Sequence, residues 1–291
     1  MNLYTKNIGK TFSGVNVLRN VNFSLEPGEV HALVGENGAG KSTFVKVLSG
    51  VYTPTIGNIY LDDQKVRINT PIAAQKNGIS LIHQEPQSFS HLSVAENIFM
   101  GHMDGSNFSR VKWKDINKSS EKILSSIGLK IDPKNIMEGL SIADQQMIEI
   151  AGALSKNSKI LIMDEPTSPL TPNEVGKLFD IVKQLKDQGM AIIFISHRLE
   201  EIRAIADRVT IFRDGDLITT KKINEVSNEE IIKYMIGRSI EDIEVKQNEY
   251  LKKNEIILSV NNISQLGNFK NISFDLKKGE ILGFAGLVGA G

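Results

Sequence analysis

The sequence contains 291 residues, of which 41% are hydrophobic and 23% charged, so it can bury a sizeable core, and its length suggests about two domains. Lys and Arg together number 34, as do Asp and Glu, which excludes a bulk positive field that would draw the protein onto nucleic acid or anionic lipid. The absence of cysteine excludes disulfides, thiolate metal sites and a cysteine nucleophile, and it suits a reducing cytoplasm.

The apolar segments of the sequence are short. The first ten residues, MNLYTKNIGK, lack the apolar run of a signal peptide, and the longest apolar runs are far below the roughly 20 residues of a membrane-spanning helix. These runs alternate with longer helical patterns, which predicts buried strands of a largely parallel sheet that are linked by crossover helices.

The first chemical motif follows an expected strand at 29–34. It reads Gly-Glu-Asn-Gly-Ala-Gly-Lys-Ser, matches G-x-x-x-x-G-K-[ST], and precedes a helical pattern at 42–48. Its glycines let backbone N–H groups surround phosphate oxygens, its lysine reaches the outer phosphates, and its serine hydroxyl can ligate Mg²⁺. A simple glycine-rich turn is disfavoured because strand and helix both stand where a P-loop needs them. The expected nucleotide contacts are Gly35, Glu36, Asn37, Gly38, Ala39, Gly40, Lys41, Ser42 and Thr43.

Two further strands are expected to end at polar residues. Gln84 follows the apolar run 79–82, and the run 160–163 is followed by Asp164 and Glu165. The carboxyl edge of a parallel sheet is where such folds bind ligands, so Asp164 is suited to hold Mg²⁺ through water and Glu165 to orient and deprotonate an attacking water. By themselves two such acids would more often form a solvated turn, and the P-loop upstream reverses that preference.

A fourth strand, at 191–195, is expected to end at Ser196 and His197. A lone histidine there would usually be a surface or capping residue. Beside a P-loop, His197 can hydrogen-bond the γ-phosphate or the attacking water, and Gln84 can reach Mg²⁺ or that water.

The sequence contains an internal repeat. Residues 20–40 align without a gap with residues 271–291, and the matches include the glycines of the P-loop. We therefore expect a nucleotide-binding domain at 1–238, a polar linker at 239–255, and the start of a second, repeated nucleotide-binding domain at 256–291. The chain stops inside the second glycine loop, so we expect it to be a truncated form of a longer protein.

Taken in order, these residues resemble the ATPases of ABC transporters, through the P-loop, Gln84 in IHQE, the segment LSIADQQMIEIAGALS, and the strand ends ILIMDEPTS and IFISH. The resemblance implies an α/β P-loop NTPase with a RecA-like core of mostly parallel sheet, an antiparallel β subdomain, and an α-helical subdomain at about 87–153. It also implies an adenine-stacking aromatic residue, which Phe12 matches, although a core role for Phe12 remains open.

The segment that begins at Leu140 departs from the usual LSGGQ of that family. Ser141 and Asp144 form an S-x-x-D capping box at the start of an amphipathic helix. The resemblance implies that Ser141 and this helix start contact the γ-phosphate of ATP bound by the opposing domain. Ala143 replaces a glycine there, and Thr171 replaces an Asp further on, where Thr171-Pro172-Asn173-Glu174 provides a helix start of its own.

Two segments, LSIADQQMIEIA and FRDGDLITTKKINEVSNEEIIKYMIGR, resemble the fused two-domain ATPases of monosaccharide importers of the ribose, galactose, xylose and autoinducer-2 type. The resemblance implies hydrolysis of ATP with Mg²⁺ that drives import through membrane permease subunits, with a periplasmic or extracellular sugar-binding protein as an indirect partner. It places the protein peripherally on the cytoplasmic face of the inner (plasma) membrane. Residues 85–97 are the candidate permease-facing surface, with a plain surface loop as the alternative.

We therefore expect catalytic roles for Glu165, His197 and Gln84. We expect Ser42, Gln84 and Asp164 to bind the metal. Two other functions stay open at this point. One is a non-transport ABC ATPase of translation or DNA repair, although the neutral charge argues against nucleic acid as a partner. The other is a fragment that binds nucleotide but is inactive without its second half.

Overall fold

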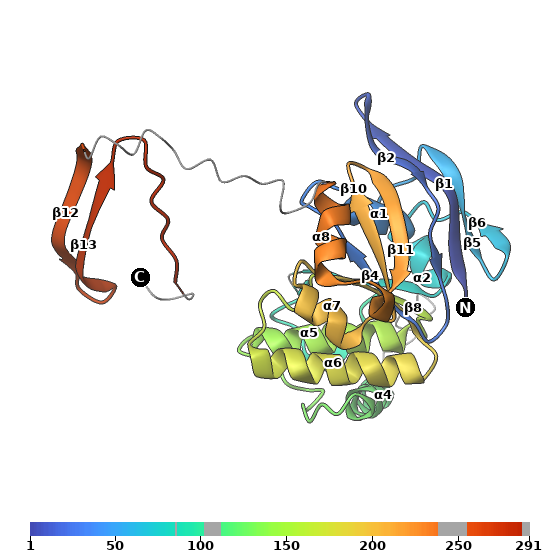
Figure 1. The fold of residues 1–291 in the computed structure, drawn as a ribbon. Coiled ribbons are helices and arrows are strands. Elements are labelled where there is room, and N and C mark those ends of the chain that lie inside the picture. Colours follow the sequence, from blue (N-terminus) through green and yellow to red (C-terminus); the bar gives the residue numbers. More distant parts are fainter. Residues whose placement is uncertain (85, 102–111, 238–254, 287–291) are drawn as a thin grey trace. The chain divides into compact units, whose positions relative to one another are not determined.

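The computed structural model describes residues 1–84, 86–101, 112–237 and 255–286, so most of the expected linker lies outside the described residues. The chain forms two compact units that divide near residue 240, and Figure 1 shows their elements.

The first unit contains a six-stranded sheet in the order β11-β10-β4-β9-β8-β7. Its neighbours from β10 to β7 are all parallel, and only the edge strand β11 runs antiparallel to β10. The predicted largely parallel sheet is therefore confirmed. The strands are β4 (Val30–Val34), β7 (Ile79–Ile82), β8 (Ile160–Asp164), β9 (Ala191–Ile195), β10 (Arg208–Arg213) and β11 (Asp216–Lys222).

Side chains alternate between two hydrophobic cores along each central strand. Leu161 and Met163 of β8 point into one core, and Ile160 and Ile162 point into the other. All four are fully buried. Burial on both faces explains why these strands read as continuous apolar runs in the sequence.

One of these cores lies between the parallel sheet, helix α1 (Lys41–Leu48) and a second, antiparallel sheet. Phe44 of α1 is fully buried there, and its ring packs against Phe23 on one side and Phe212 of β10 on the other. The second sheet and its helix comprise β1 (Leu3–Phe12), β2 (Val15–Val21), β3 (Ser24–Leu25), β5 (Ile56–Leu61), β6 (Gln64–Val66) and α2 (Pro71–Lys76).

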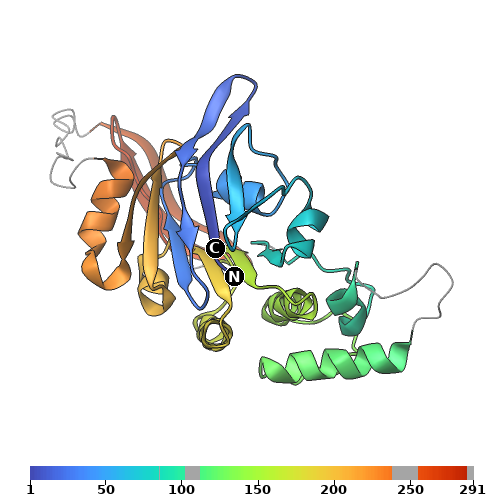
Figure 2. The same ribbon diagram turned by 90° about the vertical axis from the view of Figure 1, so that its right-hand side faces the viewer.

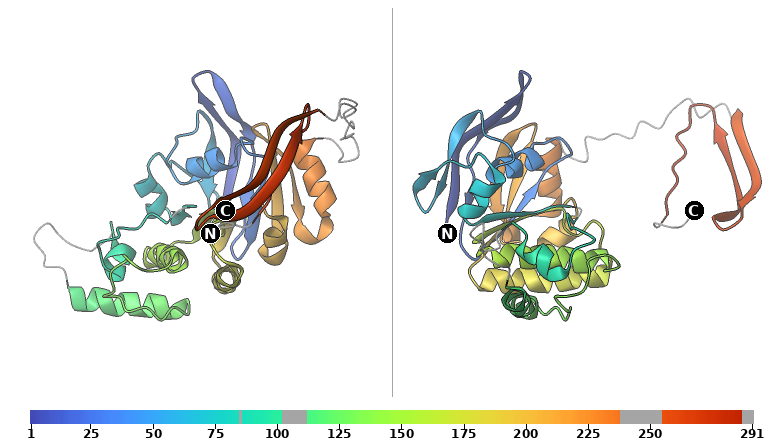
Figure 3. Two further views of the ribbon diagram at one scale, coloured as in Figure 1. Left: turned by 90° about the vertical axis from the view of Figure 1, so that its left-hand side faces the viewer. Right: turned by 180° about the vertical axis from the view of Figure 1, so that it is seen from behind.

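The other core is covered by helices, of which α3, α4 and α5 pack on one another. Figures 2 and 3 show α4 as the outermost helix of this group. In the part of the chain that the structure describes, no helix is both long and apolar enough to cross a bilayer. The helices are α3 (Val94–Phe99), α4 (Trp113–Ser126), α5 (Ile142–Ser155), α6 (Pro172–Asp187), α7 (Leu199–Ile205) and α8 (Asn228–Ile236), with a 3₁₀ turn at Ile223–Glu225.

Two of these helices begin at the caps that the sequence predicts. The Ser141 hydroxyl accepts a hydrogen bond from the Asp144 N–H and donates one to its carboxylate, at 3.1 and 2.9 Å. The Glu174 carboxylate accepts from both the N–H and the hydroxyl of Thr171, at 2.8 Å each. Pro172 occupies the first turn of α6, so the Thr171 segment is a competent helix start in spite of its departure from the family pattern.

The second unit contains the antiparallel hairpin β12 (Ile256–Gln265) and β13 (Phe269–Lys277). It reproduces details of the β1–β2 hairpin in the first unit. Ile263 pairs with Ile272 as Ile8 pairs with Val21. Asn262 and Asn271 adopt left-handed φ angles of 51° and 54°, as Asn7 and Asn20 do at 53° and 49°. The internal repeat is therefore visible in backbone geometry as well as in sequence.

A buried polar cluster surrounds His31 of β4, which is fully buried. Its Nδ1 lies 3.0 Å from the Glu29 carboxylate and its Nε2 lies 2.7 Å from the Thr210 hydroxyl. Arg208 pairs with the same carboxylate at 3.3 Å. Burial lowers the pKa of His31, so the folded protein holds this imidazole neutral.

The substitution His31→Leu removes this titration and leaves Glu29 and Thr210 with one partner fewer. The variant should melt below the wild type at about pH 7.5. Because the unfolded histidine takes up a proton below about pH 6.5 and the buried one does not, the wild type loses this stabilisation on acidification. The difference in Tm should therefore shrink towards about pH 5.5 in thermal unfolding. His91→Gln, at an exposed histidine, is the control, and a difference that stays constant with pH would contradict the assignment.

Candidate functional site

The candidate site lies where three neighbouring parallel strands end. The glycine loop follows β4, Ser196 and His197 follow β9, and Asp164 and Glu165 end β8. Strand β9 pairs with both of the others, and its Ile195 is in register with Leu33 and Asp164. The expected gathering of these residues at one edge of the sheet is therefore what the fold produces.

The glycine loop is shaped by close packing and by backbone conformation. A Cβ atom on Gly35 would lie 2.4 Å from the Phe212 carbonyl oxygen, so no larger residue fits without displacing β10. Gly40 precedes α1 with φ 107°, in the left-handed region that favours glycine. No side chain caps the first turn of α1, so its N–H groups remain available to an anion.

Lys41 lies folded into the loop that it terminates. Its ammonium donates hydrogen bonds to the Gly35 carbonyl at 2.7 Å and to the Glu36 carbonyl at 3.1 Å. The residue is 9% exposed, and burial lowers the pKa of this amine while the charges of Glu165 and Asp164 raise it. A cation whose hydrogen-bond acceptors are two peptide carbonyls favours an incoming anion with several negative charges.

Asp164 and Glu165 differ in environment. Burial, and then the neighbouring Glu165 charge, raise the pKa of Asp164, while Lys46, His83 and Lys41 oppose the shift. Glu165 has a left-handed φ of 49°, which is strained for a glutamate, and its N–H donates to the Ile195 carbonyl at 3.0 Å. Its carboxylate lies 3.4 Å from Nδ1 of His197. Glu165 and His197, for which the sequence predicts separate catalytic roles, are thus in direct contact.

The oxygen donors at this edge fit a magnesium ion. Ser42 is exposed on the first turn of α1, and the half-buried carboxylate of Asp164 stands at the end of β8. Within the described ranges, no three His, Asp or Glu side chains cluster closely enough to hold a metal by themselves. Mg²⁺ usually takes one or two ligands from the protein and completes its coordination shell with phosphate and water oxygens. The serine hydroxyl and the carboxylate at this edge are suitable ligands of that kind.

Three other expected residues lie on separate elements. Gln84 is exposed two residues beyond the end of β7, on the far side of β8 from β9. Phe12 ends β1, half-buried, with its ring edge-to-face against Tyr52 at 5.0 Å and the Lys10 ammonium 4.9 Å above it. Ser141 is exposed at the start of α5. Among the described residues, no hydrogen bond or ion pair joins these three to Lys41, Asp164, Glu165 or His197, although the end of β7 lies beside the end of β8.

Sequence reasoning missed two residues beside Asp164. The charges of His83 and Lys46 both act on that carboxyl, and burial lowers the pKa of His83. His83 immediately precedes Gln84, so its place at a strand end was a usable signal. Lys46 stands one turn beyond Lys41 in α1, on a helix whose spacing gave no reason to single it out.

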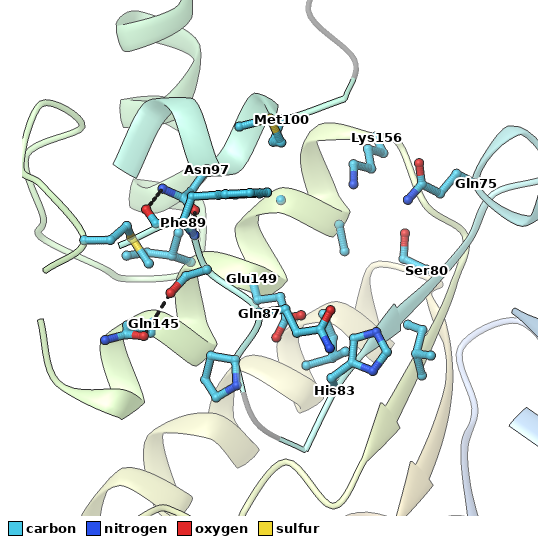
Figure 4. A pocket seen from close by; sticks show the side chains of 18 residues that line it. Gln75, Ser80, His83, Gln87, Phe89, Asn97, Met100, Gln145, Glu149 and Lys156 are labelled. Atoms are coloured by element: carbon cyan, nitrogen blue, oxygen red, sulfur yellow. Dashed lines mark hydrogen bonds between the residues drawn. The ribbon is translucent and has the colours of Figure 1, made fainter. Parts of the chain in front are cut away.

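A separate cavity of about 240 Å³ opens beside the end of β7, against α3 and α5. Figure 4 shows Glu149 of α5 inside it, next to Gln87 and His83, with Lys156 and Gln75 on the opposite wall. Burial raises the pKa of Glu149 to about 7, although the backbone amides of His83 and Gln87 favour its charged form. Among the residues that the structure describes, its buried Oε2 atom has no hydrogen-bond partner. Sequence reasoning did not identify this acid.

Known proteins resemble this chain closely in sequence. A family model described as ABC transporter matches residues 18–168. The ribose import ATP-binding protein RbsA 2 of Streptomyces avermitilis is 45% identical over 289 residues, which cover 99% of this chain and 57% of that protein. The corresponding RbsA of Clostridium tetani is 46% identical over 292 residues, with the same coverage. The chain thus spans 57% of the length of these curated relatives.

Solved structures resemble it in fold. The ADP conformation of an ATP-binding cassette of an ABC transporter matches with a TM-score of 0.72 and 26% identity, covering 82% of this chain and all of that one. A nucleotide-free ATP-binding cassette from an ABC transporter matches with a TM-score of 0.70 and 26% identity, covering 81% of this chain and 96% of that one. The whole of each cassette, or nearly so, therefore has a counterpart here.

The substitution Glu149→Gln tests the burial of that acid. The pKa of Glu149 is raised from about 4.5 to about 7, so between these pH values the folded state retains a proton that the unfolded state has lost. The folded protein therefore loses stability as the pH rises from about 4.5 to about 7, and the full loss is present above about pH 7. The variant should therefore gain about 3 to 6 °C in Tm over the wild type at pH 8 and much less at pH 5.

The exposed Glu121 of α4 provides the control as Glu121→Gln, which should leave Tm unchanged at both pH values. A gain for Glu149→Gln that is equal at the two pH values would mean that charge does not cause the effect.

Proposed function

The chain belongs to the ABC transporter family, and from this premise we propose that it hydrolyses ATP to drive import of a monosaccharide through membrane permease subunits. The observation that supports hydrolysis most directly is the cluster of Lys41, Asp164, Glu165 and His197 at the ends of three adjacent strands. The substrate class rests on the relatives, which are ribose import ATP-binding proteins.

ATP is bound first through its phosphates. Backbone N–H groups of the glycine loop and of the first turn of α1 donate to phosphate oxygens, and Lys41 exchanges its two carbonyl partners for the outer phosphates. The partly buried position of this amine makes that exchange favourable, because phosphate is a stronger acceptor than a peptide carbonyl. Phe12 provides the ring on which the adenine stacks.

Hydrolysis then depends on positioning and on charge. Glu165 orients a water molecule and accepts its proton, and His197 holds both Glu165 and the γ-phosphate. Ser42, Asp164 and Gln84 would hold Mg²⁺, which neutralises charge that develops on the phosphates. Gln84 follows β7, whose end lies beside the end of β8 that carries Asp164.

The site is completed by a second nucleotide-binding domain. We assign residues 1–238 to the first domain, 239–255 to a linker, and 256–291 to the start of a repeated domain. In support of this division, Asn262 donates its N–H to Ser273 as Asn7 does to Asn22, and the Glu280 carboxylate accepts from the N–H of Lys277 as Glu29 does from Glu26. The exposed Ser141, at the N-terminus of α5, would face the γ-phosphate held by that opposing domain.

Residues 85–97 are the proposed permease-facing stretch, with Glu85 outside the described residues. Gln87, Phe89 and Asn97 from this stretch line the cavity that also contains Glu149 (Figure 4). A permease segment seated against this cavity would contact the strand end that precedes Gln84. The protein would then lie peripherally on the cytoplasmic face of the inner membrane, with a sugar-binding protein as an indirect partner.

Two substitutions separate binding from hydrolysis. Glu165→Gln keeps the shape of the site but removes the proton acceptor, so ATP affinity should stay within about twofold while kcat falls by about two to four orders of magnitude. Lys41→Ala removes a charged donor to phosphate, so ATP affinity should fall by about tenfold to a hundredfold. Isothermal titration calorimetry and steady-state phosphate release measure the two effects.

Glu200→Gln, at an exposed acid of α7, is the control and should behave as the wild type in both assays. Full turnover in Glu165→Gln would remove Glu165 from its role, and unchanged ATP affinity in Lys41→Ala would refute the P-loop assignment. Specific activity of the wild type that rises with protein concentration would indicate that two copies of the chain complete each other's sites.

A further inference from the structure

One buried carboxylate joins the two loops that carry Glu165 and His197. Glu201 lies in the first turn of α7 and is 7% exposed. Its Oε2 accepts hydrogen bonds from the hydroxyl of Thr167 at 2.7 Å and from the hydroxyl of Ser196 at 2.6 Å. Both hydroxyl residues are themselves buried, at 3% and 2% exposure. A single oxygen atom therefore holds two separate strand ends.

The two donors to Glu201 lie close in sequence to the expected catalytic residues. Thr167 stands two residues after Glu165, and Ser196 stands immediately before His197. The loops are also joined by the backbone bond from the Glu165 N–H to the Ile195 carbonyl. If the loops moved apart, Glu201 would be left as a buried carboxyl group with one of its donors missing, and an unsatisfied buried polar group costs more than the loss of an exposed hydrogen bond.

Other groups at Glu201 hold its carboxylate in place. Arg198 approaches Oε1 at 3.3 Å, and the N–H groups at the start of α7 favour an acid in its first turn. The Ser196 hydroxyl, while it donates to Glu201, also accepts from the Arg198 N–H at 3.0 Å. This chain of bonds holds the backbone on both sides of His197.

We propose that Glu201 is a positioning residue, which ties Thr167 to Ser196 and so keeps Glu165 and His197 within contact distance during hydrolysis. The proposal rests on the proposed ATPase function. Glu201 acts through its two neighbours and does not itself contact the nucleotide. The 3.4 Å contact between Glu165 and His197 therefore depends on the hydrogen bonds that Glu201 makes with Thr167 and Ser196. The strained φ of Glu165 is one that only such a framework maintains.

The test uses a matched pair of substitutions in the full chain. Thr167→Val keeps the shape of the side chain and removes the donor, whereas Thr167→Ser keeps the donor. We expect Thr167→Val to lower kcat by about tenfold with the KM for ATP nearly unchanged, because the phosphate-binding loop is not involved, and Thr167→Ser to stay close to the wild type. Glu200→Gln is the control on the same helix turn.

A carboxylate that served stability alone would give a different result. Thr167→Val would then lower Tm without lowering kcat per folded molecule, or it would raise the KM and leave kcat unchanged. Either outcome would overturn the proposal.

Hydrogen exchange gives a second readout that needs no turnover. In Thr167→Val, amides of residues 195–199 should exchange several-fold faster, although the substitution lies in the other loop, and in Ser196→Ala the amides of Glu165, Thr167, Ser168 and Leu170 should do the same. Faster exchange confined to the substituted loop would refute the tie. If the wild type hydrolyses no ATP, the proposed function fails, and this exchange experiment still decides whether Glu201 joins the loops.

Discussion

The register of three parallel strands is the constraint on which the site depends. Because β9 pairs with β4 on one side and with β8 on the other, the residues after these strands must emerge side by side. Each strand is anchored by apolar side chains on both faces, so a slip of one residue would exchange its two cores. Hydrophobic packing of the strands therefore determines where the phosphate-binding residues emerge, and the loops determine how their side chains are oriented.

Burial then determines how these charged groups behave. The Lys41 ammonium and the Asp164 carboxyl are both drawn out of water, and burial shifts the pKa of each towards the neutral form. Their mutual attraction opposes both shifts, as do His83 and Lys46 around Asp164. A polyphosphate and its counter-ion would meet groups whose hydration has already been lost in folding, which is the condition under which fixed charges act most strongly.

Features carried by contiguous residues could be predicted from the sequence. The glycine loop, the strand ends at Asp164 and His197, and the helix starts at Ser141 and Thr171 all depend on neighbours in the chain, and the structure contains each of them. Glu201, Glu149 and the polar cluster of His31 could not be predicted, because their properties come from partners or packing remote in sequence. The roles of Phe12 and Ser141 followed only from family resemblance, and among the described residues neither forms a hydrogen bond or ion pair with the cluster.

The paired hairpins allow a separation of what a chain must preserve from what it can change. Between the two copies most side chains differ, yet an asparagine occupies both matching left-handed positions inside the strands, Asn7 and Asn20 in one copy and Asn262 and Asn271 in the other. Asparagine tolerates that conformation better than other residues with a side chain. The two copies therefore keep the same left-handed bends inside their strands while most other side chains differ, so these bends mark the repeat more clearly than the strand surfaces do.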